Sequence, residues 1–208
     1  MKPSERIALV AANGNLPSQS VLASLLAFSP YILAADGGAN KLLERGIIAN
    51  AVLGDLDSAA KLLPDSIERI LAFDQEHTDL DKCVGYLVEQ GYETIWLIGA
   101  TGDRLDHTFG SLSVLLKYGQ QVQIALIDDI GTAFPIDGDI SIETDIGQTI
   151  SLIAVGPVTG IKTTGLRWNL DNETLAPGAR DGISNEAAAK EVTISIGAGS
   201  LVIYALHQ

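Results

Sequence analysis

The sequence has a single cysteine and few basic residues, and each shortage excludes a class of protein. Cys83 has no second thiol to pair with, so an internal disulfide is excluded and a reducing, cytoplasmic setting is expected. The 208 residues include 13 Lys and Arg against 26 Asp and Glu, which gives a formal net charge of −13. Binding of nucleic acid requires basic side chains that neutralise phosphates, so we expect no nucleic acid partner. One small anion, screened by a metal ion, is compatible with this charge.

Hydrophobic runs long enough to span a bilayer are also lacking. Residues 21–35 come nearest, but Ser24, Ser29 and Pro30 interrupt them, and a membrane-spanning helix needs about 20 consecutive apolar residues. Residues 1–6 have no signal-peptide apolar region behind them, and the chain has no internal repeat. We therefore expect no membrane partner and a cytoplasmic location.

Aliphatic residues, by contrast, are abundant and occur in runs of four to six, which is the pattern of strands buried on both faces. Strand-like and helix-like segments alternate through the first part of the chain, and this alternation predicts a largely parallel sheet with flanking helices. We therefore predict a Rossmann-like α/β domain over residues 1–130. Its expected strands are residues 7–12, 31–35, 51–53, 69–73, 94–98 and 122–127, and its expected helices are residues 18–28, 41–45, a segment capped by Thr78, and 108–117.

Beyond residue 130 the pattern changes to short runs rich in Ile, Val and Thr, which are separated by glycine turns such as Asp137-Gly138. This pattern predicts a small antiparallel β-sandwich domain over residues 131–208. Residues 186–190 depart from it, because they favour a helix by propensity but are too few to hold one alone. The sequence thus predicts two domains with a boundary near residue 130.

Two carboxylates, Asp55 and Asp57, follow the short apolar run at residues 51–53. Side chains two residues apart point to the same side of an extended backbone, so both acids share one face. Like charges held this close repel, and a site that keeps both ionised usually adds a cation, for which oxygen ligands indicate Mg²⁺. An isolated Asp-x-Asp is more often a solvated turn, so this interpretation depends on the neighbouring motifs.

Four glycine-containing turns each follow a predicted parallel strand, at the edge where open α/β sheets bind ligands. Glycine lets the backbone approach a phosphate closely, and a following helix presents free N–H groups to it. None of the four is a Walker A motif, so it is their convergence that predicts a nucleotide and metal site. Arg104 lies in the last turn, and its guanidinium is suited to bind phosphate through two hydrogen bonds. The turns are residues 13–14, 36–38, 54–55 and 99–104.

Six short motifs occur in order along the chain: D-G-G-A-N from Asp36, G-D-L-D-S from Gly54, H-T-D from His77, G-D-R-L-D-H from Gly102, G-L-R-W-N-L from Gly165, and Ser184-Asn185. Together they resemble thiamine pyrophosphokinase, also called thiamine diphosphokinase, and they extend over both predicted domains. The resemblance implies an enzyme that transfers the diphosphoryl group of ATP to the hydroxyl of thiamine and releases AMP. It also implies Mg²⁺ as cofactor, and a homodimer whose thiamine sites lie near the subunit interface.

Position by position, the resemblance implies three groups of site residues. Mg²⁺ would be held by Asp55, Asp57 and Asp79. The nucleotide would be surrounded by Asn13, Gly14, Asp36, Gly37, Gly38, Asn40, Ser58, Thr78, Gly102 and Arg104. Thiamine would be bound by Trp168, Ser184 and Asn185. Separately from the resemblance, we predict that Asp106 either contacts the thiamine end or helps its hydroxyl to lose a proton. The chemistry of Trp168 agrees, because an indole face attracts a fixed cation such as the thiazolium of thiamine.

Two other functions stay open at this point. A phosphatase of the haloacid-dehalogenase type would use Asp55 as nucleophile, and Lys117 with Asp128 and Asp129 loosely follows that family's order. A non-catalytic sensor would bind thiamine and a nucleotide without turnover. The phosphatase leaves residues 131–208 unexplained, and the sensor differs from the enzyme only in turnover.

Overall fold

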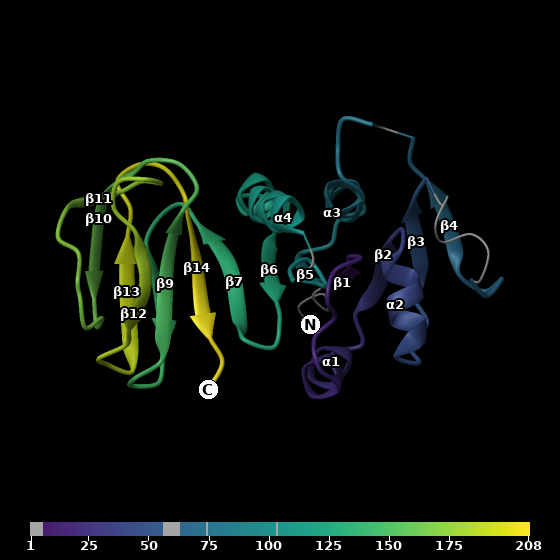
Figure 1. Cartoon of the computed structure of the whole chain (residues 1–208), viewed down its shortest axis with the longest axis horizontal. Coiled ribbons are helices and arrows are strands. Elements are labelled where there is room, and N and C mark those ends of the chain that lie inside the picture. Colours follow the sequence, from purple (N-terminus) through teal and green to yellow (C-terminus); the bar gives the residue numbers. More distant parts are fainter. Residues whose placement is uncertain (1–5, 56–62, 74, 103) are drawn as a thin grey trace, which may run out of the picture. The chain divides into compact units, whose positions relative to one another are not determined.

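Residues 6–55, 63–73, 75–102 and 104–208 are described by the computed structural model (Figure 1). The chain divides into two units, Met1–Val114 with Gln121–Asp129 and Leu115–Gln120 with Ile130–Gln208. The first unit is a mixed α/β structure with parallel strands, and the second consists mainly of antiparallel strands. The fold is therefore mixed, with both sheet types in one chain.

Six parallel strands form the sheet of the first unit, in the order β6-β5-β1-β2-β3-β4. The chain begins at β1 in the middle of this order, continues outward to β4, and then returns to β5 on the other side of β1. Because the strands are parallel, their carboxyl ends all lie at one edge. The strands are β1 (Ile7–Ala11), β2 (Tyr31–Ala35), β3 (Ala51–Gly54), β4 (Glu68–Leu71), β5 (Thr94–Ile98) and β6 (Gln123–Ile127).

Helices cover both faces of this sheet (Figure 1). Leu9 of β1 packs in one apolar cluster with Leu22 of α1 and Leu42 of α2. The opposite face is covered by α3, which packs on β1, β2 and β3 through a buried stripe that includes Leu80 and Leu87. None of the helices in the described ranges is long and apolar enough to cross a membrane. The helices are α1 (Gln19–Leu26), α2 (Gly38–Glu44), α3 (Asp79–Glu89) and α4 (Leu105–Tyr118).

All six strands predicted for this unit are present, whereas two helices begin earlier than predicted. The α2 helix begins at Gly38 rather than Lys41, and α4 begins at Leu105 rather than Thr108. Gly38 packs directly on β1, since a Cβ at this position would lie 2.2 Å from the carbonyl oxygen of Ala11. The predicted cap of α3 is confirmed, because Thr78 Oγ1 accepts a hydrogen bond of 3.3 Å from the N–H of Asp81.

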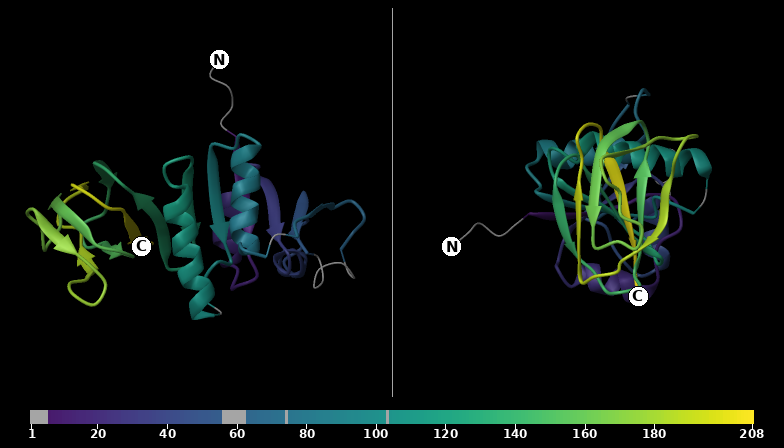
Figure 2. Two further views of the ribbon diagram at one scale, coloured as in Figure 1. Left: turned by 90° about the horizontal axis from the view of Figure 1, so that it is seen from above. Right: turned by 90° about the vertical axis from the view of Figure 1, so that its left-hand side faces the viewer.

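The antiparallel strands of the second unit lie in two sheets, in the orders β12-β9-β14-β7 and β11-β10-β13-β8. Leu152 of β9 and Ile161 of β10 belong to one hydrophobic core, so the two sheets pack face to face (Figure 2). The strands are β7 (Gly131–Ile136), β8 (Ile140–Glu143), β9 (Thr149–Ala154), β10 (Val158–Thr164), β11 (Glu173–Leu175), β12 (Gly182–Glu186), β13 (Glu191–Ser195) and β14 (Leu201–Leu206).

Residues 186–190, which favour a helix by propensity, form no helix. Glu186 ends β12 opposite Thr149, and Ala187 forms a bridge with Leu166. The side chain of Ala187 is fully buried in the core. Strand pairing and burial outweigh the local preference, because a five-residue helix is too short to offset the cost of its own nucleation.

Candidate active site

The carboxyl ends of β1 and β5 lie side by side in the first unit, but the chain leaves these strands toward opposite sides of the sheet, to β2 and to β6. A crevice at such a switch point is where open α/β sheets bind ligands. Backbone hydrogen bonds join the two loops that follow: Gly14 N–H donates to Gly99 O at 2.6 Å, and Asn15 N–H donates to Thr101 O at 3.1 Å. A Cβ at position 14 would lie 2.3 Å from Gly99 O. Gly14 is thus required for the loops to meet.

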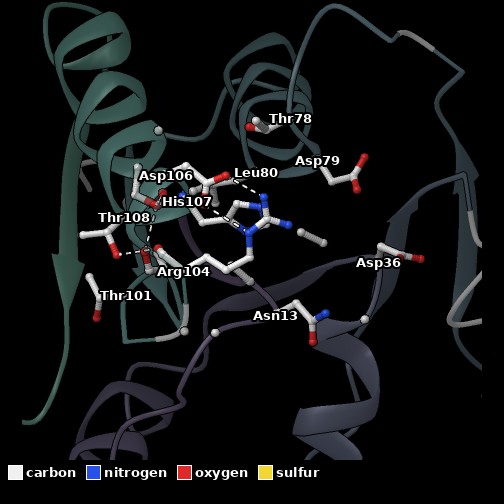
Figure 3. Close-up of a pocket in the computed structure, with 18 residues that line it drawn as sticks. Asn13, Asp36, Thr78, Asp79, Leu80, Thr101, Arg104, Asp106, His107 and Thr108 are labelled. Atoms are coloured by element: carbon white, nitrogen blue, oxygen red, sulfur yellow. Dashed lines mark hydrogen bonds and ion pairs between the residues drawn. The ribbon is translucent and has the colours of Figure 1, made fainter.

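A pocket of about 560 Å³ lies at this switch point, within the range typical of small-molecule sites (Figure 3). Its walls come from the loops after β1, β2 and β5 and from the first turns of α3 and α4. Eight residues predicted from the sequence line it: Asn13, Gly14, Asp36, Gly37, Thr78, Asp79, Arg104 and Asp106. Thr101, from the predicted turn at residues 99–104, also lines the pocket. The lining further includes Leu80, His107, Thr108, Gly110 and Ser111, which the sequence does not assign to the site.

Other predicted residues of the first unit lie away from this lining. Gly38 and Asn40 belong to α2, and Asp55 is exposed directly after β3. The carbonyl of Gly102 accepts a hydrogen bond of 2.8 Å from Asn15 Nδ2. Asp57 and Ser58 lie outside the described residues. Within the described ranges, no three Asp, Glu, His or Cys side chains group closely enough to hold a metal ion.

Asp36, which lines the pocket, carries a buried and unsatisfied oxygen. Its φ is 38°, in the left-handed region that few residues other than glycine adopt. Its Oδ1 is buried and has no hydrogen-bond partner among the described residues. A Cβ on Gly54 would lie 3.1 Å from the Asp36 Cβ, so Asp36 packs against the end of β3 that leads to Asp55. A buried carboxylate oxygen without a donor is costly unless a cation or a ligand supplies the missing interaction.

Asp79, the first residue of α3, lies across the pocket from Asp106 (Figure 3). Its Oδ1 accepts a hydrogen bond of 3.1 Å from Lys82 Nζ, one turn further along the helix. The Lys82 side chain is 12% exposed and the Asp79 side chain 37% exposed. The largely buried ammonium therefore holds the Asp79 carboxylate in place and neutralises part of its charge.

Arg104 and Asp106 form an ion pair with two hydrogen bonds, from Nε to Oδ1 at 3.1 Å and from Nη2 to Oδ2 at 2.5 Å. The hydrogen bond from Arg104 lowers the pKa of the Asp106 carboxyl below its ordinary value, and the positive charge of Arg104 acts in the same direction. Figure 3 shows the Arg104 side chain extending into the pocket, with Asp36 and Asp79 on the far side. Asp106 is thus the partner that orients the exposed guanidinium.

The predicted thiamine-binding residues lie together in the second unit. The N–H of Trp168 donates to Asn185 Oδ1 at 3.2 Å, and Asn185 Nδ2 donates to the Trp168 carbonyl oxygen at 2.7 Å. Asn185 is buried, whereas Trp168 is 56% exposed. The guanidinium of Arg167 lies 4.9 Å from the centroid of the Trp168 ring. Ser184, with φ of 59°, donates its N–H to Ser151 Oγ at 3.0 Å. Asn185 thus fixes the backbone while the indole stays accessible beside a cation.

Two family models match the chain. The model described as thiamin pyrophosphokinase, catalytic domain, matches residues 22–127. The model described as thiamin pyrophosphokinase, vitamin B1 binding domain, matches residues 139–201. The two matches together cover most of both units.

Individual relatives and solved structures are similar to the chain along nearly its whole length. Thiamine pyrophosphokinase 1 of Oryza sativa subsp. japonica is 30% identical over 84% of this chain and 77% of the relative. Thiamine pyrophosphokinase of Bacillus subtilis (strain 168) is 30% identical over 82% of this chain and 85% of the relative. A crystal structure of thiamine pyrophosphokinase from Bacillus subtilis has a TM-score of 0.84 at 26% identity, covering 98% of this chain and 100% of that one. The Candida albicans thiamin pyrophosphokinase structure, with a TM-score of 0.83 at 18% identity, covers 98% of this chain and 90% of that one and supports the fold alone.

Proposed function

The chain belongs to the thiamine pyrophosphokinase family, and from this membership we propose that it transfers the diphosphoryl group of ATP to the hydroxyl of thiamine, giving thiamine diphosphate and AMP. The observation that carries the proposal is the pocket at the switch point, where Arg104 faces the carboxylates of Asp36 and Asp79. A haloacid-dehalogenase-type phosphatase would use the aspartates, but it would not explain why residues 139–201 match the vitamin B1 binding domain.

The two halves of the chain are proposed to divide the substrates between them. Residues 1–130 would form a Rossmann-like domain that binds ATP and Mg²⁺, since the pocket lies wholly in the first unit. Residues 131–208 would bind thiamine through Trp168, Ser184 and Asn185, and would form the dimer interface that the family resemblance implies. We further propose that the enzyme works as a homodimer in the cytoplasm. A monomeric mass in sedimentation at micromolar concentration, with turnover intact, would contradict the dimer.

Carboxylate oxygens suit a magnesium ion, and one of the three carboxylates proposed to hold it, Asp79, lines the pocket. Asp55, Asp57 and Asp79 are the proposed ligands, and the unsatisfied Oδ1 of Asp36 supports a positive charge at the same edge of the sheet. When bound, Mg²⁺ would neutralise charge that develops on the phosphoryl oxygens. Lys82 would keep the Asp79 carboxylate oriented toward the site, because their hydrogen bond fixes the side chain on the helix.

The remaining catalytic work is positioning and charge stabilisation, because phosphoryl transfer needs little covalent chemistry from the protein. Arg104 would donate N–H groups to phosphate oxygens, and Asp106 would hold the guanidinium in the required orientation. A carboxylate whose pKa is lowered is a weaker base. We therefore favour positioning of Arg104, rather than removal of the thiamine proton, as the role of Asp106.

The test of the proposed function is incubation of the protein with ATP, Mg²⁺ and thiamine, followed by separation of AMP from ADP. We expect AMP and thiamine diphosphate in equal amounts, and neither without thiamine. An aspartyl-phosphate trapped on Asp55, with inorganic phosphate as product, would support the phosphatase instead. Binding of both ligands without any AMP would support a sensor.

Trp168→Ala should weaken thiamine binding and leave ATP binding unchanged. The variant loses both the buried ring surface and the cation–π attraction to the thiazolium, so we expect the thiamine dissociation constant to rise about 5-fold to 150-fold. Calorimetric titration of each ligand measures both constants. Ile146→Ala removes another exposed apolar side chain from the same unit and serves as the control. Unchanged thiamine affinity in Trp168→Ala would remove Trp168 from the site.

A further inference from the structure

Gly110 occupies an unusual position in the pocket wall. It lies inside α4, five residues after the helix begins, and it lines the pocket. Its φ is not in the left-handed region, so its backbone conformation is open to any residue. A Cβ built on Gly110 meets no heavy atom within 4 Å outside its own helical turn, in the part of the chain that the structure describes. Neither backbone geometry nor packing therefore requires glycine here.

Glycine at this position destabilises the helix, and no contact in the described part of the chain requires it. Glycine in a helix interior is less favourable than alanine because it loses more backbone freedom on folding. Gly119, just beyond the same helix, differs in this respect, since a Cβ there would lie 2.4 Å from Pro135 Cγ. The open space in front of Gly110 is part of the pocket, so the missing side chain enlarges the volume available to a ligand.

The pocket lining includes apolar surface that a flat, uncharged group could contact. Leu80, on the neighbouring helix, and Ala100 contribute carbon surface to the same pocket. Ser111 is buried, and its Oγ lies 2.8 Å from Ala100 O and 2.9 Å from His107 O. Its single hydroxyl proton is directed to these carbonyls, so Ser111 offers no donor to a phosphate. The charged lining residues are Arg104 with its partner Asp106 at the start of α4, and Asp79 at the start of α3.

We propose that Gly110 is a specificity-determining residue that leaves room for the adenine base of ATP against α4. This inference rests on the proposed function, which supplies two planar heteroaromatic groups, the adenine and the aminopyrimidine of thiamine. Adenine is the better candidate because the pocket lies in the unit that also carries Arg104, the proposed phosphate-binding residue. A side chain at position 110 would fill the space that the base occupies, while the phosphate contacts would stay in place.

The experiment compares Gly110→Ala and Gly110→Leu with the parent protein. Both residues favour a helix, so the melting temperature should rise, by about 2–4 °C for Gly110→Ala. The dissociation constant of Mg·ATP should rise with side-chain size, about 10-fold or more in Gly110→Leu, because overpacking a filled site is unfavourable. Tripolyphosphate with Mg²⁺, which lacks the base, should bind all variants equally, as should thiamine. Ser113→Ala, an exposed change on α4 outside the pocket lining, should raise stability without changing ATP binding.

Three outcomes would overturn the proposal: unchanged ATP affinity in both variants, an equal loss of ATP and tripolyphosphate affinity, or a loss of thiamine affinity alone. The last would assign the space to the aminopyrimidine. Because all constants are measured without turnover, the result is separate from the proposed function. If the parent protein forms no AMP, but the Mg·ATP dissociation constant still rises with side-chain size at position 110, only the proposed function is contradicted. If the parent protein forms AMP, but the Mg·ATP dissociation constant does not rise in the two variants, only the proposed role of Gly110 is contradicted.

Discussion

Asp55→Asn and Asp79→Asn should each reduce the formation of AMP by about 1,000-fold or more, because several kcal/mol of transition-state stabilisation depend on the metal that these carboxylates are proposed to hold. A neutral amide is a poorer ligand for Mg²⁺ than a carboxylate, so Mg·ATP binding should weaken as well. The rate is measured as AMP released at saturating substrates, and binding is measured by calorimetry. Asp139→Asn, an exposed carboxylate in the second unit, is the control for loss of one negative charge.

The two variants should differ in melting temperature. This difference distinguishes loss of metal binding from loss of folding stability. Asp55→Asn should leave the melting temperature unchanged or higher, since it removes an exposed charge from an acidic chain. Asp79→Asn should lower it, because the largely buried ammonium of Lys82 loses its carboxylate partner. The double change Asp79→Asn with Lys82→Met should recover stability but not turnover. Full activity in either single variant would remove that residue from the metal site.

Arg104→Ala should slow turnover by about 100-fold to 1,000-fold, the loss expected when one preorganised donor to a developing negative charge is removed. ATP affinity should fall, and thiamine affinity should change much less, because the guanidinium is directed to phosphate. Arg104→Lys should recover only part of the rate, since a lysine keeps the charge but lacks the two-pronged geometry. Arg180→Ala, which removes an exposed arginine paired with Glu173 in the second unit, is the control and should leave the rate unchanged.

The same variant has a consequence for the titration of Asp106. In the parent protein, the hydrogen bond from Arg104 lowers the Asp106 pKa, so the ion pair is complete at neutral pH and is lost only as the pH falls through that lowered value. In Arg104→Ala the Asp106 pKa should rise toward its ordinary value, which carboxyl NMR titration measures. Parent-level turnover in Arg104→Ala, or an Asp106 pKa that does not move, would contradict the role given to this pair.

Local features of the sequence were sufficient to predict the strands and the helix cap. Short aliphatic runs predicted β1, β2 and β3, because burial on both faces favours an apolar residue at each position. The edge strand β4 is largely exposed, and only part of it is apolar. Thr78 predicted the start of α3, since the hydrogen bond that caps the helix, here from the N–H of Asp81, joins residues close in sequence. The family resemblance likewise depended on short ordered motifs, and the comparisons confirm it.

Tertiary packing decided the features that join distant segments. The earlier start of α2 depends on Gly38 meeting the backbone of Ala11, and the strand at residue 186 depends on its pairing with Thr149. The site residues assigned from the motifs stay predictions, and Asp57 and Ser58 lie outside the described residues. The sequence by itself therefore determined which polar residues follow which strand, because that order is local. Only the tertiary structure decided that Gly14 joins two loops, that Asp36 keeps an unsatisfied oxygen and that Gly110 faces open space, because each depends on atoms far away in the chain.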